Sequence, residues 1–339
     1  MIKAEIIADS LSPANNRLTT YILEYPRFVH AELMTHRVFS KNASSSRAIP
    51  IEKMIEMVKT NPAMPVWWGK NQSGMQAAEE LNDTELKHQN VVDGIYGAMT
   101  DRELAKALWL QSRDLAIEQV KKLNEVGLHK QIANRILEPW LHIRVILSGT
   151  EFENFFALRV HKDAQPEIRE LARQMLELYN ASTPKKIKAG EWHIPFGDKI
   201  DNERLNQIVY QANIADLTER TNYKIELAKK IAIARCARVS YLNFEGKDDY
   251  EADIKLCDRL FGSVPRHLSP TEHVAMALED RNVWSGNFRG FKQYRKFFSQ
   301  ENLTDDRVIK HDRLEGYSHI IDDGDCTDHG YHIPKQPIK

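Results

Sequence analysis

The sequence predicts an α+β fold that is rich in helices and contains a small, mostly antiparallel sheet. Apolar residues alternate along 2–8 (IKAEIIA), as in a β-strand. Segment 17–25 (RLTTYILEY) is rich in Thr, Tyr and Ile and is expected to be its partner strand. Helical patterns cover much of the remaining chain. At 339 residues the chain can bury a large core in one or two domains.

The helices are predicted from apolar residues that recur at helical spacing. Pro26 is expected to begin a helix that ends near His36. Gly127 and Gly190 are expected to stop helices. Further helices are predicted over 51–60, about 101–126, 151–161, 165–181, 217–240, 248–261, 270–280 and 287–298.

Two segments have no regular pattern. Segment 62–74 (PAMPVWWGKNQSG) is predicted to be an irregular loop. Its two tryptophans, Trp67 and Trp68, could form a stacking platform, but packing is favoured. The tail gathers His, Asp and Cys residues between His311 and His332. These are metal ligands, but their spacing fits no ligand pattern. We therefore expect a solvated acidic tail and no metal site.

Charge and cysteine content indicate a cytoplasmic enzyme, of a cell or of an infected host. The 47 basic and 48 acidic residues leave a formal charge of −1, so no global field attracts nucleic acid or a membrane. No apolar run approaches a membrane span, and the N-terminus lacks the apolar core of a signal peptide. Cys236, Cys257 and Cys326 form an odd, sparse set that suits a reducing compartment. Cys236 falls in a helical pattern and is expected to be buried.

A candidate phosphate pocket lies between residues 36 and 47. His36 and Arg37 precede a run of serines that includes Ser45, with Asn42 within it and Arg47 behind it. A guanidinium makes forked, charge-assisted hydrogen bonds to phosphate oxygens, and small hydroxyls add to them. A helix end followed by a serine-rich loop would give the same pattern, so the chemistry alone leaves both interpretations open.

The same segment resembles the signature of the flavin-dependent thymidylate synthase family, in which Arg-His-Arg is followed after seven residues by Ser. Two positions depart from that signature: Thr35 stands in place of the first Arg, and Glu32 in place of a Gln. The family binds flavin and nucleotide here, so both changes bear on binding. The matching residues are His36, Arg37, Ser40, Asn42, Ser45 and Arg47.

A second match covers 148–168. Leu158-Arg159 falls where the family has Leu-Arg, and Arg159 takes the place of the Arg that contacts the pyrimidine. An alternative for Arg159 is a surface ion pair with Asp163, worth about 0.2–0.5 kcal/mol. The other matches are Asn154-Phe155 and Ala164-Gln165-Pro166-Glu167-Ile168, whereas Ser148, Thr150 and Asp163 replace an Asn, an Arg and a His that the family uses for flavin.

Upstream, 129–140 (HKQIANRILEPW) resembles the family's Glu-x-Ala-Arg-x-x-Leu-Pro segment. Either Asn134 or Arg135 takes the role of its Arg.

A third match is out of order. The family's Ser-Pro-x-Glu-His segment normally precedes the Arg-His-Arg helix, whereas here it is 269–273. The segment before it, 232–246, resembles the family's N-terminal segment, and 285–298 resembles a diverged second copy of a family helix. The chain therefore resembles the large phage-type members, with a permuted or partly duplicated layout. We expect a first family-like half over 1–200, a second over 201–300 and a tail over 301–339.

The resemblance implies conversion of dUMP to dTMP with methylenetetrahydrofolate and FAD that NADPH reduces. None of the three cysteines has the Pro-Cys-His or Pro-Cys-Gln setting of the folate-only thymidylate synthases, so reduced flavin would carry the hydride. It assigns catalysis to Ser45 and Arg159, nucleotide binding to Arg47, Ser45, Arg159, Glu32 and Arg135, and flavin binding to His36, Arg37, Asn42, Asn154 and His273.

Two other functions stay open. Water could quench the methylene intermediate to give a hydroxymethyl product, from dUMP or from dCMP. A non-catalytic nucleotide-binding or structural relative would explain the departures at Thr35, Ser148, Thr150 and Asp163.

The layout also predicts an assembly. Because one chain carries two family-like halves, two chains could rebuild what four shorter ones normally make. We expect a homodimer, with a homotetramer as the alternative, and we expect His273 to lie close to 36–47.

Overall fold

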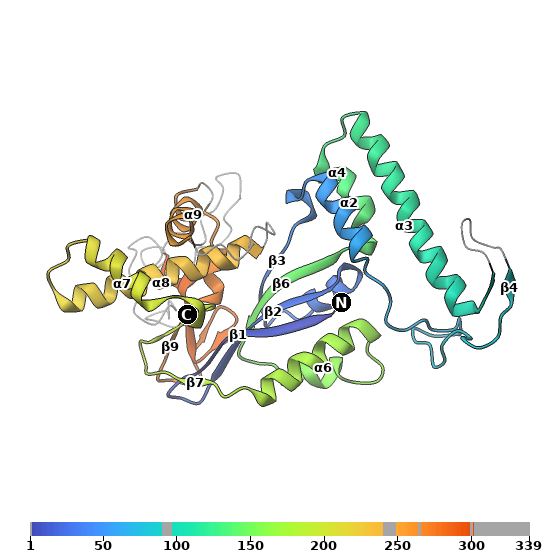
Figure 1. The fold of residues 1–339 in the computed structure, drawn as a ribbon. Coiled ribbons are helices and arrows are strands. Elements are labelled where there is room, and N and C mark those ends of the chain that lie inside the picture. The colour runs from blue at the N-terminus through green and yellow to red at the C-terminus, as the bar shows by residue number, and fades with distance from the viewer. Residues whose placement is uncertain (1, 90–96, 240–248, 264–265, 299–300, 302–339) are drawn as a thin grey trace, which may run out of the picture.

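The computed structural model describes residues 2–89, 97–239, 249–263, 266–298 and 301, and it confirms the α+β class (Figure 1). Its main sheet has five strands in the order β3-β6-β2-β1-β7, antiparallel except for the β1–β7 pair. The strands are β1 (Lys3–Leu11), β2 (Arg17–Pro26), β3 (Ser40–Ala43), β6 (His142–Gly149) and β7 (Lys185–Lys186).

Both faces of the sheet are covered. One face carries Tyr21, Leu23 and Val145, and it packs against α5 (Glu153–Arg159) and α6 (Pro166–Ala181). The other face carries Ile22 and Ile146, which meet the C-terminal end of α8 (Leu217–Val239) at Cys236 and Val239. β6 is therefore apolar on both sides, and Cys236 is buried as predicted.

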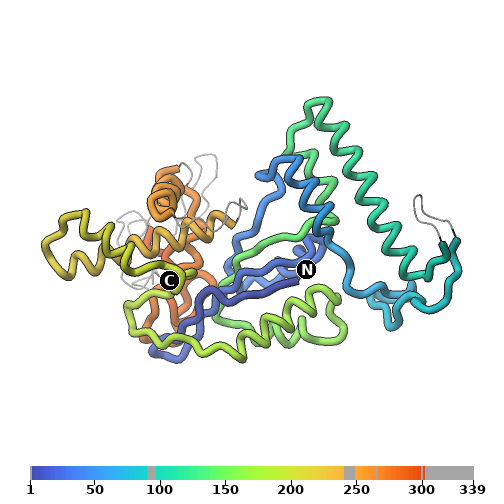
Figure 2. The backbone as a smooth tube through the Cα atoms, in the orientation of Figure 1, coloured from blue at the N-terminus to red at the C-terminus, as the bar shows by residue number. Residues whose placement is uncertain are grey.

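A second core lies beyond the end of the sheet. Helices α2 (Ile51–Thr60) and α3 (Asp101–Glu125) pack there with α4 (Lys130–Ala133) and the 3₁₀ helix η3 (Asn134–Trp140). A capping box of Thr100 and Glu103 begins α3, and Gly127 follows its end with a left-handed φ of 82°. Figure 2 shows this group of helices standing apart from the C-terminal elements.

The C-terminal elements form their own layer against β3 and β6. After α7 (Asn202–Gln211) and α8 come α9 (Tyr250–Gly262) and the 3₁₀ helix η5 (Ser269–His273). A three-stranded sheet in the order β12-β9-β8 lies beside them. It consists of β8 (Trp192–His193), β9 (Ala275–Ala277) and β12 (Phe291–Gln293), with the hairpin β10 (Trp284–Ser285) and β11 (Phe288–Arg289) adjacent.

The two tryptophans of the irregular loop differ. Trp68 packs edge-on against Trp109 of α3, in line with the packing favoured from the sequence, whereas Trp67 is exposed.

The remaining elements of the described residues are short. They are α1 (His30–Met34), β4 (His88–Gln89), β5 (Ala98–Met99) and the 3₁₀ helices η1 (Arg27–Val29), η2 (Ser46–Ala48), η4 (Gly197–Lys199) and η6 (Tyr294–Phe297). In the described residues, no helix is long and apolar enough to cross a bilayer.

Two predicted helices are wrong, and so is one predicted helix stop. Segment 287–298 forms short strands and a 3₁₀ turn because Gly290 adopts a left-handed φ that a helix excludes. Segment 270–280 forms the end of η5 and β9, which pairs with β8 and β12. Gly190 lies in the turn between β7 and β8, after α6 has already ended. The predicted tail 301–339, with its metal-ligand types and Cys326, lies outside the described residues except for Glu301.

The packing around β6 gives a first prediction. A Cβ on Gly149 would lie 2.6 Å from Cδ1 of Phe39, whose ring packs against Phe152. Gly149→Ala should therefore lower the free energy of unfolding by about 1–3 kcal/mol, measured by chemical denaturation. Gly262→Ala is the matched control, because a Cβ added there would have no atom within 4 Å. Equal stability of the two variants would contradict the tight contact.

Candidate active site

Arg159 is the centre of the site, and segment 32–36 holds its guanidinium from three sides. Its Nε donates to Nε2 of His36 at 2.9 Å. Its two terminal nitrogens donate to Oε2 of Glu32 and Oγ1 of Thr35, each at 3.4 Å. The two positions that depart from the family signature, Glu32 and Thr35, are thus both in contact with Arg159.

The alternative of an Arg159–Asp163 ion pair is wrong. The Asp163 carboxylate lies 3.5 Å from Nδ1 of His161 instead. Arg159 ends α5, and its side chain points back to the turn that follows α1. Residues that are 123 positions apart in the sequence, from two separate motif matches, therefore meet.

The imidazole of His36 has a defined tautomer. Because Nε2 accepts a hydrogen bond from Arg159, the proton of the neutral ring lies on Nδ1. The ring also packs edge-on against Phe155, with centroids 4.9 Å apart. Burial, and then the charges of Arg159 and Lys41, lower the pKa of His36, so the ring stays neutral.

Lys41 fixes the turn that carries His36. Its ammonium donates to the carbonyl oxygen of His36 at 2.5 Å and to that of Leu33 at 3.3 Å, at the C-terminal end of α1. A cation is favourable there because the last carbonyls of a helix lack partners. Burial lowers the pKa of Lys41 to about 8. Glu32, on the same helix, has its pKa raised by burial even though Arg159 opposes the shift.

Arg37 and Arg47 flank β3 and are exposed to solvent. Among the described residues, neither guanidinium makes a hydrogen bond or an ion pair. Free guanidinium groups can bind an anionic ligand without breaking an internal contact. Ser45 is half-buried beside Arg47, and Asn154 is exposed on α5.

Asn134 and Arg135 have different roles. Asn134 is fully buried, and its Nδ2 donates to the carbonyl oxygens of Ser46 and Ile49 at 2.8 and 2.9 Å. It therefore holds the 3₁₀ turn that contains Arg47. Arg135 is exposed and pairs with Glu138 at 2.8 Å. Of the two, Arg135 is the side chain that can reach a ligand.

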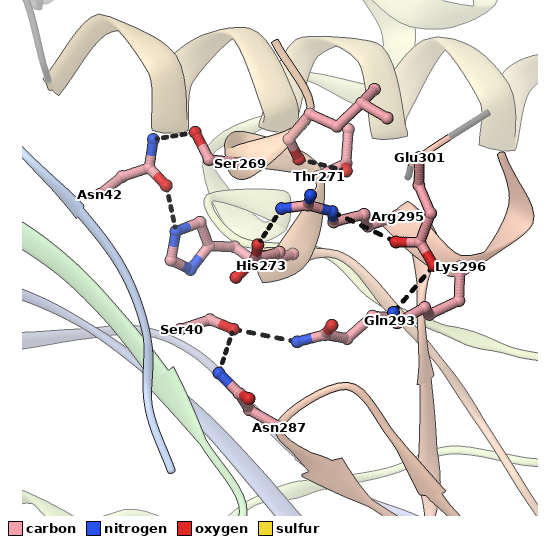
Figure 3. Close-up of polar contacts among 12 residues, drawn as sticks. Ser40, Asn42, Ser269, Thr271, His273, Asn287, Gln293, Arg295, Lys296 and Glu301 are labelled. Atoms are coloured by element: carbon pink, nitrogen blue, oxygen red, sulfur yellow. Dashed lines mark hydrogen bonds and ion pairs between the residues drawn. The ribbon is translucent and has the colours of Figure 1, made fainter. Parts of the chain in front are cut away.

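Side chains of the C-terminal layer contact β3 (Figure 3). Oγ of Ser40 accepts from Nε2 of Gln293 at 2.9 Å and from Nδ2 of Asn287 at 3.4 Å. The Asn42 amide lies 3.2 Å from Nε2 of His273 and 3.4 Å from Oγ of Ser269. The prediction that His273 lies close to 36–47 is thus confirmed, and the contact is within one chain.

His273, which the resemblance assigns to flavin, lies inside the protein. Its ring is fully buried, and both nitrogens are engaged, Nε2 with Asn42 and Nδ1 with Ser148 at 2.8 Å. In this arrangement the ring supports Asn42 and leaves no nitrogen for a cofactor. Asn42 is itself buried, with 8% of its surface exposed.

Two replaced flavin positions of the family also face inward. Ser148 contacts His273, and Oγ1 of Thr150 accepts from the backbone nitrogen of Arg289 at 3.0 Å. Both side chains therefore help to attach the C-terminal layer to β6. Sequence reasoning missed His193, which belongs to the same buried polar group, because nothing in 190–196 (GEWHIPF) indicates its partners.

Buried histidines predict a loss of stability in acid. Burial lowers the pKa of both His193 and His273 from 6.5 to about 3. The unfolded chain takes up these protons near pH 6.5, so the stability present above that pH is lost as the pH falls toward 3. At pH 5 the loss should be about 2 kcal/mol per histidine. The denaturation midpoint should change less with pH in His193→Gln than in the control His161→Gln, which changes an exposed ring. An equal change of the midpoint with pH in the two variants would contradict the lowered pKa of His193.

Comparison with known proteins agrees with the motifs. Residues 9–185 match the family model of the thymidylate synthase complementing proteins, Thy1. The chain is 28% identical over 167 residues to the flavin-dependent thymidylate synthase of Sulfurisphaera tokodaii, a match that covers 46% of this chain and 64% of that relative.

Among solved structures, the chain resembles the UMP/dUMP methylase PolB of Streptomyces cacaoi. With 5-Br dUMP bound, the TM-score is 0.37 at 17% identity, over 53% of this chain and 90% of PolB. With 5-Br UMP bound, the TM-score is 0.35 at 17% identity, over 53% and 88%. Because the family model spans more than half of the sequence, the chain belongs to the thymidylate synthase complementing protein family, Thy1.

Proposed function

We propose that the protein is a flavin-dependent enzyme that transfers a one-carbon unit to C5 of a pyrimidine nucleotide, with dUMP as substrate and dTMP as product. The observation that carries the proposal is the Arg159 site, where two family motifs distant in sequence meet at hydrogen-bonding distance. Methylenetetrahydrofolate would supply the carbon, and FAD reduced by NADPH would supply the hydride.

Arg159 is suited to hold the pyrimidine. Glu32, Thr35 and His36 fix the direction of its guanidinium before any ligand arrives, so little side-chain freedom is lost on binding. A fixed cation beside the base would stabilise an anionic, enolate form of the ring, in which C5 is nucleophilic. This is the catalytic role that we assign to Arg159.

Arg47 and Ser45 are suited to the phosphate. Arg47 is exposed and free among the described residues, and Asn134 holds the turn that carries it. Arg135, near this turn, would add a second cation. We assign His36, Arg37 and Asn154 to the flavin, because Arg37 and Asn154 are exposed and His36 is in contact with Arg159. Asn42 would complete the flavin site at its buried edge.

The thiols support a route through flavin. Cys236 and Cys257 are both buried, and burial raises the pKa of each, to about 12 for Cys257. Neither of these thiols can act as the nucleophile that the folate-only enzymes use. In the described residues, the site chemistry therefore consists of binding, orientation and charge stabilisation.

The runner-up keeps the site and changes the substrate or the product. Glu32 contributes a carboxylate beside Arg159, and a carboxylate can accept a hydrogen bond from the amino group of cytosine, which uracil lacks. This observation favours dCMP, with a methyl or a hydroxymethyl product. A non-catalytic relative is the third candidate, since Ser148 and Thr150 bond the protein's own C-terminal layer where the family binds flavin.

The C-terminal contacts also support a permuted layout. η5 carries the Ser-Pro-x-Glu-His segment and contacts β3 of its own chain through Asn42. We propose that 201–300 acts as a second family-like half, with 1–200 as the first. A homodimer would then supply the family's composite sites, and a homotetramer remains the alternative.

The flavin and the product can be tested together. The purified protein should bind FAD, with flavin absorbance or a raised melting temperature on addition of FAD. Incubation with reduced FAD, methylenetetrahydrofolate and either dUMP or dCMP, followed by mass spectrometry, should give the methyl product of dUMP. A hydroxymethyl product or a product from dCMP would favour the runner-up. If the protein binds nucleotide but neither binds FAD nor turns the nucleotide over, the result would favour the non-catalytic relative.

The two nucleotide arginines give a separate test. Losing a hydrogen bond to a charged group costs about 1.5–3 kcal/mol, so Arg47→Ala and Arg159→Ala should each weaken dUMP binding by more than tenfold in calorimetry. Arg47→Ala should leave the melting temperature unchanged, because its guanidinium has no partner among the described residues. Arg173→Ala, which removes an exposed arginine of α6, is the control. A loss of stability without a loss of binding would assign both arginines to structure.

A further inference from the structure

A continuous chain of buried hydrogen bonds links β1 to β3 through the interior. It runs from Ser10 through His193, Thr20, Ser148 and His273 to Asn42, and it crosses strands of the two sheets and η5. Four links measure 2.8 Å (Ser10–His193 and His193–Thr20), 2.6 Å (Thr20–Ser148) and 2.8 Å (Ser148–His273), and the last, from His273 to Asn42, measures 3.2 Å. Every side chain in it is at least nine-tenths buried.

The orientation of the Asn42 amide sets the direction of the chain. Rotating the amide by 180° from its orientation in Figure 3 brings Nδ2 within 3.3 Å of the carbonyl oxygen of Lys41 and within 3.2 Å of that of Ser269. A backbone carbonyl can only accept, so it requires the nitrogen on that side. Nδ2 then also lies 3.2 Å from Nε2 of His273, which must accept.

The remaining protons follow from this one choice. With Nε2 as acceptor, neutral His273 carries its proton on Nδ1 and donates to Ser148. Ser148 then donates to Thr20, and Thr20 donates to Nε2 of His193. His193 in turn carries its proton on Nδ1 and donates to Ser10. Both histidines thus adopt the same tautomer, and each hydroxyl has an acceptor for its single proton.

The chain of hydrogen bonds can transmit the direction of its donors from one end to the other, but it cannot transmit charge. Burial keeps both imidazoles neutral, with a pKa of about 3, and each hydroxyl has one proton to give. A hydroxyl that accepted from both neighbours would have no acceptor for its own proton within this chain, so reversing one bond favours reversing the others. The reversed chain would turn a donor of His273 toward the Asn42 nitrogen, or turn the amide away from its two carbonyls. Either outcome leaves a buried polar group unpaired, which is unfavourable.

We propose that His193 is a positioning residue for the flavin site. By accepting from Thr20 it keeps the protons of Thr20 and Ser148 directed toward itself. This holds His273 in the tautomer that accepts from Asn42, and so fixes the Asn42 amide and strand β3, which lies between Arg37 and Arg47. This inference rests on the proposed function for its link to flavin, but the coupling of the two histidines stands on the hydrogen bonds alone.

Interrupting the chain at Thr20 is the sharpest test, because Thr20 touches neither Asn42 nor the exposed arginines. Thr20→Val keeps the shape and removes the hydroxyl, so the Ser148 proton has only Nδ1 of His273 to bond. Thr20→Ser keeps the hydroxyl and is the matched control. Ser10→Ala, at the far end, is a second variant that removes the acceptor of His193 with a smaller change in packing.

Two readouts decide the outcome. The ¹⁵N shifts of labelled histidines report the tautomers of His193 and His273 in the ligand-free protein, and titration with FAD reports affinity. In Ser10→Ala, both rings should lose the Nδ1-protonated form together. In Thr20→Val, His273 should lose that form, whereas His193 should keep it because its Nδ1 still donates to Ser10. FAD binding should weaken by threefold or more in both variants. Thr20→Ser should match the unsubstituted protein in both measurements.

An unchanged His273 tautomer in folded Thr20→Val or folded Ser10→Ala would overturn the coupling. Changed tautomers with unchanged FAD affinity would overturn the positioning role. If the unsubstituted protein binds no FAD, the proposed function and the positioning role for flavin both fail, while the ¹⁵N shifts still decide whether the two histidines are coupled.

Discussion

Strand β3 must be held from two sides, and the rest of the structure depends on this constraint. Its backbone pairs with β6, while its inward side chains bond the C-terminal layer through Ser40 and Asn42. The exposed Arg37 and Arg47 lie just before and just after it. A strand of four residues has few backbone hydrogen bonds of its own, so these side-chain contacts help to place the strand that both arginines flank.

The Arg159 site depends on the same strand. Lys41, in β3, caps the turn that contains His36, and His36 accepts from Arg159. A shift of β3 would therefore move the ring that orients the guanidinium. Two residues here depart from the family signature. Thr35 is a neutral residue in place of a cationic Arg, and Glu32 is an anionic residue in place of a neutral Gln. Arg159 is thus paired before a ligand binds, and the local charge is less positive than the family signature implies.

Much of the fold could be predicted from local patterns, and the exceptions have physical causes. The strands β1 and β2 and the helices α2, α3, α6 and α8 follow from their periodicity. β6 escaped prediction because it is buried on both faces and does not alternate. Phe288 and Phe291 have the spacing of a helix face, yet the left-handed Gly290 between them forms a turn. For the site, the motifs brought Arg159, His36, Asn42, Ser148 and His273 into consideration. Thr20 and His193 join them only through long-range packing that no local pattern encodes.

The edges of the main sheet limit how copies of this chain can associate. At one edge, η5 and side chains from 287 and 293 lie along β3. At the other edge, β7 is only two residues long, and both are exposed lysines. Short, charged or covered edges resist pairing with a foreign strand. A continuous intermolecular extension of the main sheet is thereby disfavoured, and this sheet is protected from edge-to-edge aggregation.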